Sequence, residues 1–212
     1  AQAHLREALA LFIENYGPEH PDVAVFYTNL GVYLINDGNV EDGVSALQKA
    51  LEADRVNFGP EHPAVGVGLF NIGTTVDTAG DLDRASEMYE QALTILKNAL
   101  GPKHSEVAAV STALGWLLAR QGAFSRAEEL LEQALEVRGE LGVDPVYVSQ
   151  TQLHLAQTLW LQDQADAVAL GLATKAVPVL KDSGEYGTGI FSKFESWSKT
   201  HLSEEIRDAL LR

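Results

Sequence analysis

Three histidines recur at a fixed interval and are the first residues whose type and spacing could support chemistry. His20, His62 and His104 follow one another every 42 residues. Imidazole is a common metal ligand, so this recurrence suggests a metal site. Each histidine, however, lies just before an expected helix start, where a polar side chain can cap the helix, and stacked repeats keep equivalent positions apart. We therefore expect three helix caps and no metal site.

Paired carboxylates and a glycine-rich segment are the other places where chemistry could lie. Glu128-Glu129 and Glu204-Glu205 fall on polar faces of expected helices and are typical of solvated surface. The glycines of segment 184–189 lack the lysine and the strand-to-helix context of a phosphate-binding loop. The sequence contains no HExxH or GxSxG motif and no cysteine. We expect no catalytic activity and no cofactor.

Composition limits the partners that the chain can bind. Its 212 residues include 30 acidic and 15 basic ones, which gives a formal net charge of −15. Such a chain repels nucleic acid and anionic membranes. Hydrophobic residues make up 46% of the sequence, as in a folded protein, yet no apolar run is long enough to span a membrane. We expect a cytoplasmic protein.

The histidines belong to a repeat of 42 residues. The sequence GPEHP at 17–21 returns at 59–63, and again as GPKHS at 101–105, with a weaker copy at 142–145. Each unit predicts two helices, such as 23–36 and 40–58, because proline marks helix starts and glycine marks helix ends. Asn39 and Asp81 occupy the position that precedes the second helix, where we expect N-caps. Helix pairs of this kind stack into a solenoid, since neither helix can bury its apolar face alone.

Small residues inside the expected helices indicate where the helices touch. Gly31, Gly73 and Gly115 share one position of the repeat, and Ala50 and its equivalents share another. A glycine inside a helix costs about 1 kcal/mol relative to alanine. That cost is explained if another helix backbone comes close, so we expect a close approach at each of these glycines.

The repeat resembles the tetratricopeptide repeat family, specifically its 42-residue variety similar to kinesin light chains. In the second unit the matching residues are Leu69, Ile72, Gly73, Val76, Ala85, Tyr89 and Ala92; in the first unit Gly43 stands where alanine is usual. The resemblance implies an all-α fold, a right-handed superhelical solenoid of helix pairs with a C-terminal capping helix. It places the array at 1–181, with a half repeat at 1–21, full repeats at about 22–63, 64–105 and 106–145, and a degenerate repeat at 146–181.

Both ends of the chain depart from the repeat. The segment 182–189 contains three glycines and predicts a linker, so that 182–212 forms a linker followed by a capping helix, interrupted near His201 and restarting at Ser203. Phe191, Phe194 and Trp197 lie along this helix, which either caps the array only or also folds back into its groove. At the other end, 1–16 corresponds to a second helix without its first. We expect a fragment of a longer protein, able to self-associate through this helix.

In the family the first helix of each pair lines a concave groove, and this resemblance supplies the candidate binding residues. They are Asn29, Phe70, Asn71, Thr112, Trp116, Arg120, His154 and Trp160. Asn29 and Asn71 match an asparagine that contacts the peptide backbone in light-chain-like members. The aromatic residues are candidate anchors, and core packing between helices remains an equally open interpretation for them. For the two asparagines, a bridge between neighbouring helices is as open as ligand contact.

These residues predict a protein–protein interaction module that binds an extended peptide in the groove. Arg120 is the one cation among them, so a clamp for a C-terminal carboxylate is not expected. The acidic charge favours a neutral or basic partner over an acidic one. The alternative is a structural or self-assembling scaffold, or a regulatory domain of a larger protein such as a bacterial signalling protein.

Overall fold

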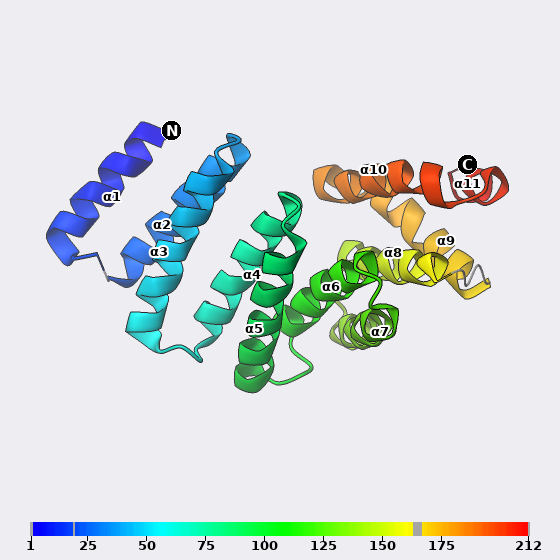
Figure 1. The fold of residues 1–212 in the computed structure, drawn as a ribbon, viewed down its shortest axis with the longest axis horizontal. Helices are drawn as coiled ribbons and strands as arrows, with labels where there is room; N and C mark the ends of the chain where they lie inside the picture. The colour runs from blue at the N-terminus through cyan, green and yellow to red at the C-terminus, as the bar shows by residue number, and fades with distance from the viewer. Residues whose placement is uncertain (1, 19, 163–166, 212) are drawn as a thin grey trace. The chain divides into compact units, whose positions relative to one another are not determined.

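All secondary structure in the described part of the chain is helical. The computed structural model describes residues 2–18, 20–162 and 167–211 (Figure 1). The eleven helices within these residues are α1 (Gln2–Tyr16), α2 (Pro21–Asn36), α3 (Val40–Phe58), α4 (Pro63–Thr78), α5 (Leu82–Leu100), α6 (Ser105–Arg120), α7 (Phe124–Leu141), α8 (Pro145–Leu161), α9 (Ala167–Asp182), α10 (Gly184–His201) and α11 (Glu204–Leu211). None of them is long and apolar enough to cross a membrane.

The recurring histidines cap helices, as the sequence predicts. The imidazole Nδ1 of His20, His62 and His104 accepts a hydrogen bond from the backbone N–H two residues further on, at 3.2 Å in each case. Within the described residues, no group of three or more His, Cys, Asp or Glu side chains is placed to hold a metal ion. These three histidines therefore have a structural role at helix starts.

The two expected caps of the second helices differ from each other. The Asp81 carboxylate accepts a hydrogen bond from the backbone N–H of Arg84 at 3.3 Å, so this prediction is confirmed. Asn39 occupies the N-cap position of α3, but its side chain makes no capping bond and instead donates to the Asp37 carboxylate at 3.2 Å. The expectation of a side-chain cap at Asn39 is wrong: the side chain bonds through its amide N–H to Asp37, whereas a cap requires its amide oxygen to accept a bond from the helix backbone.

The chain forms two compact units, residues 1–110 and 111–212, and α6 begins in the first and ends in the second. In the first unit α2 pairs with α3 and α4 with α5, while α3 packs on α4 and α1 on α2. Its hydrophobic core includes Leu9, Val23 and Leu34, and the rings of Phe12 and Phe26 meet at 4.7 Å. Each pair buries the apolar stripe of both helices, which is the arrangement that the repeat predicts.

Glycine allows the two helices of a pair to touch. A Cβ atom on Gly31 would lie 2.8 Å from Cγ of Leu47 and 2.9 Å from the carbonyl oxygen of Gly43. A Cβ atom on Gly43 would lie 2.9 Å from the carbonyl oxygen of Gly31 and 2.5 Å from Cγ1 of Ile35. The two glycines thus face each other across α2 and α3, which explains why glycine replaces the usual alanine at position 43.

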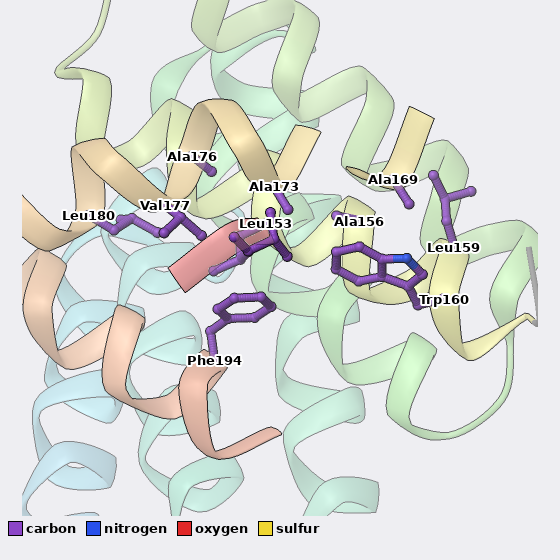
Figure 2. Packing of buried hydrophobic residues seen from close by; sticks show 11 residues of the cluster. Leu153, Ala156, Leu159, Trp160, Ala169, Ala173, Ala176, Val177, Leu180 and Phe194 are labelled. Atoms are coloured by element: carbon purple, nitrogen blue, oxygen red, sulfur yellow. The ribbon is translucent and has the colours of Figure 1, made fainter. Parts of the chain in front are cut away.

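In the second unit, α8, α9 and α10 enclose an aromatic and aliphatic core (Figure 2). Phe194 of α10 is 2% exposed, and its ring lies 6.5 Å from that of Trp160 on α8. The buried members of this cluster are Leu153, Ala156, Leu159, Trp160, Ala169, Ala173, Ala176, Val177, Leu180, Phe194 and Leu210. The C-terminal helices therefore complete the core of the second unit.

The predicted linker at 182–189 is wrong, since α10 already begins at Gly184. Gly187 packs so closely on the end of α9 that a Cβ atom would lie 2.9 Å from the carbonyl oxygen of Leu180. In the same turn the Tyr186 hydroxyl donates to the Gln150 side-chain oxygen at 3.1 Å. These tertiary contacts outweigh the low helix propensity of the glycines. The predicted interruption is confirmed: α10 ends at His201, and α11 starts after Ser203.

Candidate binding surface

Charge is distributed unequally between the two helices of each pair. The first helices of the pairs carry few charged residues: Asp22 in α2, Asp77 in α4, Glu106 and Arg120 in α6, and none in α8. The second helices α3, α5 and α7 carry between five and seven each. An exposed helix face normally carries charged residues. The first helices therefore offer a sparsely charged surface, on which Asp22 and Arg120 are the exposed charged residues among those described.

In the first unit, α2 presents an exposed stripe of this kind. Val25 is 57% exposed and Val32 is 48% exposed, and the exposed Asn29 lies between them. The spacing of four and three residues places all three on one face of α2. Asn29 is exposed, and its contact with a ligand stays a prediction.

Phe70 and Asn71 on α4 are less accessible than Asn29. Both are partly buried, and the Phe70 ring lies 5.7 Å from the buried ring of Tyr89 on α5. The backbone carbonyl of Asn71 accepts a hydrogen bond from the Thr75 hydroxyl at 2.9 Å. Asn29 and Asn71 share a position in the repeat, yet Asn29 is exposed and Asn71 is partly buried.

In the second unit, three candidate residues form one stack. The rings of Trp116 on α6 and His154 on α8 lie 4.9 Å apart and are nearly parallel, with an angle of 9° between them. The guanidinium carbon of Arg120 lies 5.7 Å from the Trp116 ring centre, within cation–π range. Arg120 is exposed, whereas Trp116 and His154 are partly buried. The sequence predicted the helices that carry these three side chains but not their contact, which the structure shows.

The His154 imidazole is uncharged at neutral pH. Burial lowers the pKa of His154 to about 4, and the positive charges of Arg120, Arg138 and Lys193 act in the same direction. Its hydrogen bond with Gln157, with 3.2 Å between Nδ1 and Oε1, acts in the opposite direction. Because an amide oxygen only accepts hydrogen bonds, Nδ1 carries the proton. The stack is therefore an aromatic surface with one exposed cation, Arg120, at its edge.

Two predicted groove residues belong to the interior instead. Thr112 is 2% exposed, and its hydroxyl lies 3.3 Å from that of Thr151 on α8. Trp160 is 8% exposed, and its ring centre lies 6.5 Å from that of Phe194 and 6.0 Å from that of Trp197, both on α10. The expectation that they line a binding surface is wrong, because α8 covers the first and α10 covers the second. For Trp160 the signal was present in the sequence, since a capping helix rich in aromatic residues needs an aromatic partner.

The sequence analysis missed the buried Arg138 of α7. This side chain is 5% exposed and donates to the Tyr147 carbonyl oxygen and the Thr151 hydroxyl. Its positive charge also contributes to lowering the pKa of His154. The burial of Arg138 could have been predicted from its spacing to the apolar residues of the same helix. Arg138 follows Leu131 and Ala134 by seven and four residues, which places it on the buried stripe of the helix.

Solved structures confirm the fold. BtubC (BKLC) of P. vanneervenii is 22% identical, with a TM-score of 0.70 over 92% of this chain and 73% of that one. A P. anserina protein described as a kinesin light chain with nearly identical TPR-like repeats is 19% identical, with a TM-score of 0.68 over 87% of each chain. These likenesses establish an all-α helical-repeat solenoid similar to kinesin light chains.

Sequence comparison establishes the family. No curated protein matches the chain significantly. The sequence pattern described as Tetratricopeptide repeat matches residues 22–98 and 87–140, which together make up more than half of the sequence. The helix pairs, the glycine contacts within them and this match agree with one another, and the chain belongs to the tetratricopeptide repeat family.

Proposed function

We propose that the chain binds an extended segment of a partner protein on its first-helix surface and catalyses no reaction. The tetratricopeptide repeat fold supports a protein–protein interaction module in general. Each unit has a first-helix surface of its own, and the proposal is made for each unit separately. In the first unit this surface consists of Val25, Asn29, Val32, Phe70 and Asn71, and in the second of Trp116, Arg120 and His154.

The observation that carries this proposal is the exposed stripe of Val25, Asn29 and Val32 on a helix with one charged residue. Exposed valines stabilise a folded protein only when something covers them, because burying apolar surface contributes about 25 cal/mol per Å². An amide between them offers one donor group and one acceptor, which suits the backbone of an extended peptide. A peptide backbone therefore complements the stripe better than a charged or compact ligand.

The charge of the chain supports a neutral or basic partner. The net charge is −15, and the helices α3, α5 and α7 concentrate acidic residues. Long-range attraction increases association rates for basic partners and depends on salt. Association with a basic peptide should slow as salt rises, and association with a neutral one should not.

A display library of random peptides tests the proposal. Peptides selected on the full chain are measured against Asn29→Ala and Trp116→Ala, with Gln48→Ala on the exposed face of α3 as matched control. Loss of an interface anchor costs about 2 kcal/mol, so we expect roughly 30-fold weaker binding for at least one of the first-helix variants and no change for the control. Selected peptides that bind both first-helix variants as tightly as the wild type, or that lose affinity with Gln48→Ala, would contradict the proposal.

Self-association through α1 is a second candidate function. Leu11 is 54% exposed and Tyr16 is 59% exposed on this helix, although Phe12 and Ile13 pack inward. A second chain that covers these side chains would bury apolar surface. Sedimentation at increasing concentration tests this candidate: we expect association that Leu11→Glu abolishes. A monomer at all concentrations excludes it.

A further inference from the structure

Arg138 is a buried cation whose contacts, among the described residues, are all uncharged. Its guanidinium donates from Nη1 to the backbone carbonyl of Tyr147 and, at 2.7 Å, to the Thr151 hydroxyl. The guanidinium carbon lies 5.6 Å from the Tyr147 ring centre. Arg138 is 5% exposed, and burial lowers its pKa. Burying a charge is unfavourable unless pairing and hydrogen bonds offset the lost hydration, and an apolar side chain of similar length would avoid this cost.

The hydrogen bonds of Arg138 connect three helices. Thr151 receives the guanidinium bond, and its hydroxyl also donates to the Tyr147 carbonyl at 3.0 Å. The same hydroxyl lies 3.3 Å from that of Thr112 on α6. Thus the side chain extends from α7 to α8, and a chain of hydroxyl groups continues from α8 to α6.

The Trp116–His154 stack lies one helical turn further along the same two helices. Trp116 follows Thr112 by four residues on α6, and His154 follows Thr151 by three on α8. Side chains with this spacing share a helix face. Whatever fixes the distance between the two threonines therefore also fixes the distance between the two rings.

We propose that Arg138 is a positioning residue that holds α8 against α6 so that His154 stacks on Trp116. Its effect on the ring stack is independent of any ligand. Its effect on binding rests on the function proposed above, because the stack is part of the first-helix surface. Arginine suits this role better than lysine, since its planar fork can serve two acceptors at once.

Two variants and one control test the role of Arg138 in the folded chain. Arg138→Met keeps the apolar stem and removes the donors, and Thr151→Val removes the hydroxyl while preserving its shape. Arg126→Met is the control on the exposed face of the same helix. NMR follows the Trp116 indole N–H resonance and the titration of His154. In both test variants we expect the indole resonance to shift, whereas the control leaves it unchanged. The titration of His154 is read in Thr151→Val, which keeps the Arg138 charge that itself lowers the pKa of His154, and there we expect it to move to higher pH.

The outcomes separate positioning from simple stabilisation. A lower melting temperature with an unchanged Trp116 resonance and an unchanged His154 titration overturns the proposal. If Arg138→Met does not fold, Thr151→Val decides in the same way, and Arg138→Lys should restore folding but only part of the stack.

A selected peptide adds a readout of binding. We expect it to bind Arg138→Met about tenfold more weakly although Trp116 is intact. If the NMR changes occur and no peptide discriminates, the positioning role stands while the proposed function fails.

Discussion

Replacing Gly43 by alanine should destabilise the first unit, even though alanine is the better helix former and is the usual residue at this position of the family. The added Cβ atom would lie 2.5 Å from Cγ1 of Ile35 and 2.9 Å from the carbonyl oxygen of Gly31. Both distances are far shorter than an ordinary van der Waals contact, and one of them involves backbone. The α2–α3 pair must therefore separate slightly to accommodate the methyl group.

The expected size follows from two opposing effects. Alanine in place of glycine stabilises a helix by about 1 kcal/mol. Overpacking a closely packed contact costs about 1–3 kcal/mol, and the upper part of that range applies because the Gly31 carbonyl cannot rotate away. We expect a net loss of about 1–2 kcal/mol. Gly139→Ala is the matched control, since this helical glycine of α7 has nothing within 4 Å of a built Cβ, and it should gain up to about 1 kcal/mol.

Urea unfolding followed by circular dichroism at 222 nm measures both variants. Because repeat arrays can unfold in steps, the shift of each transition midpoint is compared at constant slope. The reasoning is refuted if Gly43→Ala unfolds at the same or a higher urea concentration than the wild type. The same conclusion follows if Gly139→Ala loses as much stability as Gly43→Ala, because steric contact then cannot be the cause.

Three further predictions concern caps, core and pH. His62→Ala should lower the free energy of unfolding by about 1 kcal/mol because it removes an N-cap bond, whereas Asn39→Ala should change it little; thermal unfolding distinguishes the two. Trp160→Ala should cost about 3–5 kcal/mol by opening a cavity beneath α10, and a smaller loss in urea unfolding would place Trp160 outside the core. The pKa of His154 is lowered from 6.5 to about 4, so between these pH values the unfolded chain binds a proton that the folded chain does not. The contribution of His154 to the free energy of unfolding is therefore complete above pH 6.5 and is lost as pH falls towards 4. The loss amounts to about 2–3 kcal/mol, and in His154→Gln the unfolding free energy should vary less over this pH range.

Helix boundaries could be predicted where local chemistry decides them. The Asp37-Gly38 break and the following Gly59-Pro60 predicted the limits of α3 at Val40 and Phe58, and α2 begins two residues before its predicted position. These signals act within a few residues and need no tertiary information. The start of α10 could not be predicted in this way, because three glycines in 184–189 disfavour a helix and the close packing of Gly187 on the end of α9 is visible only in the folded chain.

The candidate surface was less predictable than the fold. Asn29 and Asn71 occupy the same repeat position, and nothing in their own sequence indicates that only Asn29 is fully exposed. Exposure depends on which aromatic side chain a neighbouring helix contributes, as Tyr89 does beside Phe70. A repeat pattern thus identifies the face of a helix, while the neighbouring helices determine how much of that face remains open.

Trp116 and Trp160, the two tryptophans on first helices of the second unit, show how a neighbouring helix determines exposure. Trp116 contacts His154 and Arg120 and remains partly exposed, whereas Trp160 lies beneath Phe194 and Trp197. The predicted groove positions Leu153 and Trp160 share one core cluster with Phe194, so α10 packs on them. Burying Phe194 alone contributes about 1.5–3 kcal/mol, and detaching α10 would expose the whole cluster. A partner peptide that competes for this face would have to replace that core, so Trp116 and His154 are the better target on the second unit.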